Sequence, residues 1–110
     1  MTKLYIVSGP MEGTSTELKG EITFAGRASD NDIQIKDRSI SRKHVKIIRK
    51  NSRFFIEDLG SENGTWINGK PIKPGYEFEV EEGFPIAIGD TLISLGKECS
   101  EDGKKHKYTI

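Results

Sequence analysis

Apolar and polar residues alternate in short runs along this chain, and a turn signal follows nearly every run. Apolar residues two positions apart share one face of an extended strand, as do Ile22 and Phe24 or Val45 and Ile47. Gly-Pro, Asn-Gly, Pro-Gly and Gly-Asp steps separate the runs, and such pairs favour tight turns. No long window has an apolar stripe at helical spacing. Many short strands joined by turns predict an all-β sandwich or barrel.

Residue choice agrees with strands, because the chain has 14 Ile and 3 Val but only 5 Leu and 3 Ala. A length of 110 residues with 34% hydrophobic residues suits one compact domain rather than a disordered segment. We expect that domain over residues 1–96, followed at 97–110 by a polar tail that contains a final strand or begins a linker. Four aromatic residues are candidates for the core: Tyr5, Phe24, Phe54 and Phe78.

Reactive side chains are too few and too scattered for the common enzyme and metal sites. Cys99 is the only cysteine, which excludes an intrachain disulfide and a cysteine-based zinc site. His44 and His106 have no spacing typical of metal ligands or of a nucleophile and its base. We therefore expect no metal, no cofactor and no catalysis. The apolar run Leu4–Val7 is too short for a signal peptide or a membrane span, so a cytoplasmic location is expected.

The formal charge is zero, with 17 basic and 17 acidic residues, which argues against a general polyanion binder. The distribution is uneven, because residues 36–53 include eight basic residues and one acidic residue. Nucleic-acid binding is one alternative for this stretch. However, the stretch has no recognised nucleic-acid motif, and its charges alternate along strands. A local site for one anionic group fits this distribution better.

Three loop sequences carry side chains suited to a phosphorylated group. Gly26-Arg27 ends one strand, Ser41-Arg42-Lys43-His44 enters the next long strand (44–50), and residues 58–65 (DLGSENGT) leave the strand after that. An arginine fork and a hydroxyl suit a dianionic tetrahedral group. A phosphorylated side chain offers about −1.5 to −2 charges and three acceptor oxygens. Asn63 can both donate to and accept from a peptide backbone, so these loops predict a phosphopeptide site.

These loops, together with Asn68-Gly69 and Ile88-Gly89-Asp90, resemble in order and spacing those of the forkhead-associated (FHA) domain. The resemblance runs from about Lys3 to Leu95. It implies a β-sandwich of two twisted sheets, about eleven short strands and recognition loops at one end. It also implies binding to phosphothreonine-containing segments of partner proteins, the substrates of Ser/Thr kinases, by a signalling adaptor without catalysis.

From this resemblance we expect a monomeric module, alone or within a larger multidomain protein, that binds neither nucleic acid nor membrane. The alternative is a phosphate-independent interaction module that uses a sheet face. Such a module would not need the arginine, serine and asparagine that the three loops retain.

The resemblance also gives each loop residue a role. Arg27 clamps the phosphate, Ser41 donates its hydroxyl to a phosphate oxygen, and Arg42 adds a phosphate or peptide contact. Asn63 holds the peptide main chain beside the phosphothreonine. Three residues support the site without touching the ligand: Gly26, His44 and Gly64.

Glu62 departs from the family pattern, which often has threonine or another small or neutral residue at this position. A carboxylate about 4 Å from a phosphate costs up to roughly 4 kcal/mol per pair of unit charges at an effective dielectric constant of about 20. We therefore expect Glu62 to turn outward, towards Lys36 or Arg38, or to pair with a basic residue of the peptide. In the second case it favours targets with Lys or Arg near the phosphothreonine.

Overall fold

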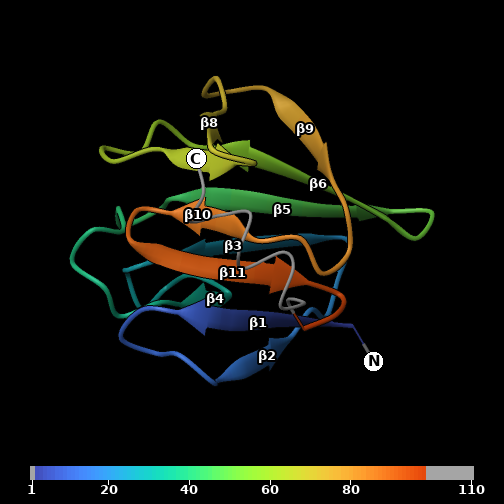
Figure 1. Cartoon of the computed structure of the whole chain (residues 1–110), viewed down its shortest axis with the longest axis horizontal. Coiled ribbons are helices and arrows are strands. Elements are labelled where there is room, and N and C mark those ends of the chain that lie inside the picture. The colour runs from blue at the N-terminus through green and yellow to red at the C-terminus, as the bar shows by residue number, and fades with distance from the viewer. Residues whose placement is uncertain (1, 99–110) are drawn as a thin grey trace.

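Eleven strands form two stacked sheets in the computed structural model, which describes residues 2–98 (Figure 1). The six-stranded sheet has the order β2 (Ser15–Glu17), β1 (Lys3–Ser8), β11 (Thr91–Leu95), β10 (Ile86–Ile88), β7 (Thr65–Ile67) and β8 (Lys70–Pro71). The five-stranded sheet has the order β4 (Ile33–Gln34), β3 (Ile22–Gly26), β5 (Val45–Lys50), β6 (Arg53–Asp58) and β9 (Glu77–Val80). The pairing is antiparallel except between β3 and β4. The predicted all-β sandwich is confirmed.

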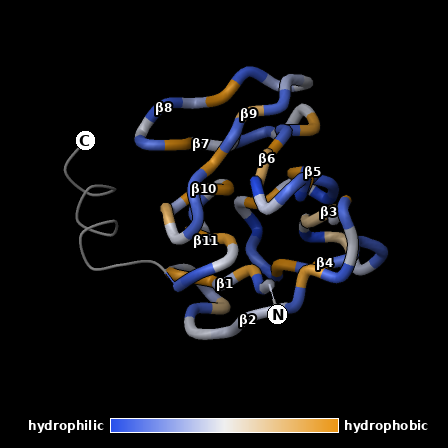
Figure 2. The backbone as a smooth tube through the Cα atoms, turned by 90° about the vertical axis from the view of Figure 1, so that its right-hand side faces the viewer, coloured by the Kyte–Doolittle hydropathy of each residue, from blue (hydrophilic) through white to orange (hydrophobic). Residues whose placement is uncertain are grey.

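Isoleucine fills most of the core between the two sheets. Figure 2, turned by 90° from Figure 1, separates the sheets and shows apolar positions along the strands on both sides of the interior. Ile47 lies opposite Ile56 on β5 and β6, and Ile86 lies opposite Ile93 on β10 and β11. All four side chains are at most 1% exposed. Branched side chains pack well on pleated surfaces, which explains why isoleucine outnumbers leucine in this chain.

Of the four aromatic core candidates, only Phe54 is a core residue, with 3% exposure. Phe78 is 37% exposed, because β9 is the last strand of its sheet and no strand lies beyond it. Tyr5 and Phe24 are only half-buried, since their neighbours in sequence, such as Leu4, point into the core and leave them on the outer faces. The core assignment was therefore wrong for these three residues.

The connections between β4 and β5, β6 and β7, and β10 and β11 gather at one end of the sandwich, on the left in Figure 1. This is the arrangement that the sequence led us to expect for the recognition loops. The start of β1 and the end of β11 lie at the opposite end, where the Gly96 amide donates to the Lys3 carbonyl at 2.8 Å.

Residues 2–98 contain no helix of the length and apolar character needed to cross a membrane. Lys97 and Glu98 are the only residues of the expected tail that the structure describes. The possible final strand, Cys99 and His106 lie outside the described residues.

Candidate functional site

The end of β3 is joined tightly to the segment that enters β5. The Arg27 amide donates to the Ser41 carbonyl at 3.0 Å, and the Ala28 amide donates to the Arg42 carbonyl at 3.2 Å. A Cβ added to Gly26 would lie 2.2 Å from the Arg42 carbonyl oxygen, so the close approach requires glycine. The sequence therefore brings Arg27 and Ser41 side by side through their backbones.

The Arg27 side chain is exposed but anchored at one atom. Its Nε donates to the Ile40 carbonyl at 3.0 Å. Within residues 2–98, no carboxylate lies within 4 Å of its guanidinium group. The two terminal nitrogens therefore remain for a ligand, in the fork geometry that suits two oxygens of a phosphate.

The Ser41 hydroxyl group accepts one hydrogen bond from the neighbouring loop and keeps its own proton to donate. The Glu62 amide donates to Ser41 Oγ at 3.0 Å, so the oxygen already accepts a hydrogen bond from the neighbouring loop. A serine hydroxyl also carries one donor proton. That proton is directed to no described acceptor, and an anionic oxygen bound beside Arg27 can receive it.

His44 is fully buried and connects the two loops that carry Ser41 and Asn63. Its Nδ1 accepts from the Ser41 amide at 3.1 Å, and its Nε2 lies 2.9 Å from the Gly64 carbonyl. Burial lowers the pKa of His44, although the Gly64 carbonyl and Asp58 act in the opposite direction. The neutral ring with its proton on Nε2 satisfies both contacts. His44 therefore holds the site together and has no nitrogen left for a ligand.

Asp58, at the end of β6, organises the loop that follows it. Its carboxylate accepts from the Ser61 amide at 3.1 Å, from the Ser61 hydroxyl, and from Thr65 Oγ1 at 3.0 Å. Ser61 Oγ accepts in turn from the Gly64 amide at 3.0 Å, and Gly64 adopts a positive φ of 83°. Asp58 and Ser61 belong to the loop motif, but the sequence alone indicates no role for them. Their hydrogen bonds set the loop that carries Glu62 and Asn63.

The Asn63 side chain is exposed and is fixed on one side. Its Nδ2 donates to the Ser39 carbonyl at 2.8 Å. The second N–H and the Oδ1 have no hydrogen bond to a described residue. One donor and one acceptor are thus available together, which is the pair needed to hold an extended peptide backbone.

Glu62 contributes its backbone to the site, while its side chain is exposed. It lies within 4 Å of no described cation, so the expected pairing with Lys36 or Arg38 is not found. The amide faces inward towards Ser41, which leaves the carboxylate to solvent. Pairing with a basic residue of a ligand stays a prediction.

Ion pairs redistribute the positive charge of residues 36–53. Four of the eight basic residues there lie within 4.0 Å of a carboxylate: Lys43 with Asp30, Lys46 with Glu57, Lys50 with Glu77 and Arg53 with Glu79. The other four have no such described partner: Lys36, Arg38 and Arg42 belong to the connection between β4 and β5, and Arg49 lies on β5. Three of the four cations without a carboxylate partner therefore lie in the connection at the loop end, whereas three of the four on strands β5 and β6 have one.

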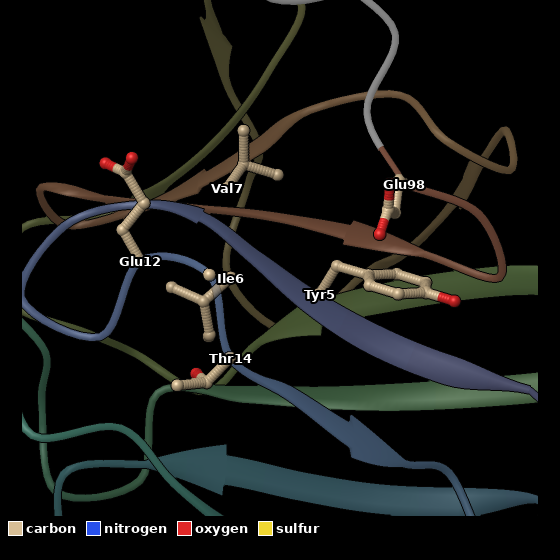
Figure 3. A pocket seen from close by; sticks show the side chains of 7 residues that line it. Tyr5, Ile6, Val7, Glu12, Thr14 and Glu98 are labelled. Carbon is tan, nitrogen blue, oxygen red and sulfur yellow. The ribbon is translucent and has the colours of Figure 1, made fainter.

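A separate pocket lies over β1 and the turn that follows it (Figure 3). It is lined by Tyr5, Ile6, Val7, Glu12, Gly13, Thr14 and Glu98. Its two charged lining residues, Glu12 and Glu98, are both carboxylates, so this pocket repels a phosphate. Residues 2–98 contain no cluster of three His, Cys, Asp or Glu side chains suited to a metal ion.

The sequence matches the family model of the FHA domain over residues 23–89. It is 39% identical over 103 residues to the glycogen accumulation regulator GarA of Mycobacterium tuberculosis. That match covers 91% of this chain and 62% of GarA, so the chain spans less than two thirds of the length of this relative.

Two solved structures are similar in fold. One, from a structural and functional analysis of phosphothreonine-dependent FHA domain interactions, has a TM-score of 0.75 and 25% identity, and the match covers 90% of this chain and 98% of that one. The other is the FhaA FHA domain in complex with the intracellular domain of Rv3910. Its TM-score is 0.73 with 26% identity, over 86% of this chain and 99% of that one.

Proposed function

Because this chain belongs to the FHA domain family, we propose that it recognises phosphothreonine-containing segments of partner proteins. The observation that supports this most strongly is that the Ser41 hydroxyl has a donor proton available for a ligand. Ser41 Oγ accepts a hydrogen bond from the Glu62 amide at 3.0 Å, which leaves its proton available to an anion. The backbone of Ser41 is bonded to that of Arg27, whose guanidinium group is anchored at the Ile40 carbonyl. Charge-assisted hydrogen bonds of this kind are the strong contacts to a phosphate.

The contacts divide between the phosphate and the peptide backbone. The two terminal nitrogens of Arg27 bind two phosphate oxygens, Ser41 donates to the phosphate, and Arg42 adds a further contact to phosphate or peptide. The open donor and acceptor of Asn63 hold the peptide main chain next to the phosphothreonine. Gly26, His44 and Gly64 keep these groups in place and do not touch the ligand.

Glu62 adds a preference for basic targets. Its exposed carboxylate has no described cation within 4 Å, and it lies one residue before Asn63. A Lys or Arg near the phosphothreonine gains an ion pair with Glu62. The test is Glu62→Thr, measured with peptides that differ only by one such residue. The preference should disappear in the variant, and an unchanged preference would refute the assignment.

The biological setting follows from the same proposal. The module occupies residues 1–96, works in the cytoplasm as a signalling adaptor, and binds substrates of Ser/Thr kinases. It binds its ligand without changing it, so catalysis belongs to the kinase that phosphorylates the partner.

Fluorescence anisotropy with one peptide in three forms tests the proposal. The phosphothreonine form should bind, the phosphoserine form should bind more weakly, and the unmodified form should not bind. Arg27→Ala should abolish binding of the first form. Arg53→Ala is the matched control, because Arg53 is also exposed but starts β6 at the opposite end of the sandwich.

Three results would contradict the proposal. Equal binding of the three forms would favour a phosphate-independent sheet-face module, and intact binding by Arg27→Ala would remove the assigned phosphate clamp. Tight binding to mixed-sequence DNA with a steep salt dependence would favour nucleic-acid binding instead.

A further inference from the structure

Three consecutive residues between β4 and β5 each hold a different group of the proposed binding site. The Ile40 carbonyl accepts from Arg27 Nε at 3.0 Å. The Ser39 carbonyl accepts from Asn63 Nδ2 at 2.8 Å. Ser41 Oγ accepts from the Glu62 amide at 3.0 Å. The conformation of residues 39–41 therefore sets where the phosphate and peptide contacts point.

A buried carboxylate just before this segment fixes its conformation. Asp37 is 9% exposed, and its Oδ1 accepts from both the amide and the hydroxyl of Ser39, each at 2.9 Å. The Asp37 carbonyl accepts from the Ile40 amide at 3.0 Å. Both residues whose carbonyls orient Arg27 and Asn63 are thus bonded directly to Asp37.

The other oxygen of Asp37 reaches the opposite sheet. Thr91 Oγ1, on β11, donates to Asp37 Oδ2 at 2.6 Å, and Thr91 is fully buried. The neighbouring Asp90 amide donates to Ser39 Oγ at 2.8 Å. Asp37 and Ser39, which lie between two strands of the five-stranded sheet, are therefore hydrogen-bonded to Asp90 and to Thr91, the first residue of β11 in the six-stranded sheet.

Asp37 holds these contacts as a carboxylate. Burial raises its pKa, but the hydrogen bonds from Thr91 and Ser39 outweigh burial, and the pKa is lowered. A charged acceptor binds its donors more strongly than a neutral one does. The contacts therefore persist at neutral pH.

We propose that Asp37, braced by Thr91, is a positioning residue that pre-sets Arg27 and Asn63 for the phosphothreonine ligand. This inference rests on the proposed function. Without the hydrogen bond from Thr91, residues 39–41 adopt other conformations in part of the molecules. Only the molecules in the conformation seen here bind the phosphothreonine ligand. The apparent Kd rises in inverse proportion to the fraction of such molecules. Asp37 touches no ligand itself.

Thr91→Val tests the brace with little change of shape, because it removes the hydroxyl and keeps the branched side chain. We expect a Kd about tenfold higher for the best phosphothreonine peptide from a degenerate library. Thr91→Ser keeps the hydroxyl and should bind like the unmodified protein. Ser94→Ala is the matched control on the same strand: it removes another fully buried hydroxyl, which donates to the Lys97 carbonyl at 2.8 Å, at the far end of β11. Asp37→Ala, which removes all three side-chain contacts, should weaken binding further.

A second readout needs no ligand. The side-chain amide resonances of Asn63 in a ¹⁵N-correlated NMR spectrum should shift or broaden in Thr91→Val and stay in place in Ser94→Ala. Unchanged Asn63 resonances in Thr91→Val would overturn the proposal, whether or not any peptide binds. If the unmodified protein binds no phosphothreonine peptide, the proposed function fails, and this readout still decides the positioning role.

A double-mutant cycle separates positioning from general stability. In an Asn63→Ala background, Thr91→Val should raise the Kd by a smaller factor than in the unmodified protein, because one of the groups it positions is gone. Equal factors in both backgrounds, or a Kd of Thr91→Val that matches Ser94→Ala, would refute the role. All Kd values are measured at a temperature where thermal unfolding curves show each variant to be folded.

Discussion

Replacing Gly26 by alanine tests the junction that places Arg27 beside Ser41. The added Cβ would lie 2.2 Å from the Arg42 carbonyl oxygen and 2.8 Å from its carbonyl carbon. Ordinary contact begins near 3.4 Å, so the two backbones must separate by more than about 1 Å. The opposing atoms belong to the main chain and cannot rotate away. Overpacking of this kind is relieved only by a backbone shift.

That shift weakens the hydrogen bonds that flank Gly26. They run from the Arg27 amide to Ser41, from the Ala28 amide to Arg42, and from the His44 amide to the Ala25 carbonyl, at 3.0 to 3.2 Å. At about 0.5–1.5 kcal/mol each, the loss of all three predicts a decrease of about 1.5–4.5 kcal/mol in the free energy of unfolding. That is a large share of the roughly 5–15 kcal/mol typical of whole proteins.

Urea denaturation followed by tryptophan fluorescence measures this difference. Gly20→Ala is the control, because a Cβ there would have no neighbour closer than 3.8 Å, and this variant should be neutral or slightly more stable. A decrease below about 1 kcal/mol for Gly26→Ala would mean that the backbones separate easily, and would refute the reasoning.

Three further measurements test other parts of the structure. Because the pKa of His44 is lowered in the folded state, the unfolded chain binds a proton that the folded one does not. The free energy of unfolding should therefore fall as pH decreases below about 6.5; urea midpoints at about pH 7.5 and 5.5 should differ less in His44→Asn than in the unmodified protein. Arg53→Met removes an exposed pair with Glu79, which raises the pKa of Arg53 and lowers that of Glu79; it should leave the urea midpoint unchanged, and a clear decrease would show that the pair matters for folding. Ile56→Ala should cost about 2–5 kcal/mol in urea denaturation, whereas Ile22→Ala, at 50% exposure, should cost far less; similar costs would contradict the assigned core.

The strands of this chain could be predicted from local patterns. Those patterns could not show which side chains on a strand the rest of the sandwich covers. Alternation shows that Phe78 and Val80 share a face, and they do. It does not show that β9 is an edge strand, which leaves Phe78 37% exposed while Val80 is 6% exposed. The order of strands in a sheet depends on pairing between distant segments, and no short window contains that information.

The proposed site likewise contains residues that local motifs indicate and residues that only the folded chain brings together. Arg27, Ser41 and Asn63 stand in short motifs that a single sequence displays, although their roles in binding are still proposals. The brace of Asp37 joins residues 54 positions apart, and Thr91 had no local signal of its own. The spacing of Asp37 and Ser39 is typical of an Asx turn, in which the aspartate accepts from the amide two residues on. That local feature could have indicated Asp37.

The hydrogen bond between Gly96 and Lys3 has a practical consequence for assays. It makes the two ends of the described sandwich neighbours, about one strand length, or roughly 20 Å, from the proposed binding loops. A fluorescent protein or biotin tag attached next to Lys3 or Gly96 should leave the ligand path open, and tethering to a sensor surface at these points turns the loops outward. The same geometry makes such fusions poor reporters of binding, since neither end lies where the ligand arrives. A dye on exposed Arg38, replaced by cysteine in a chain whose Cys99 has been changed to serine, would be nearer.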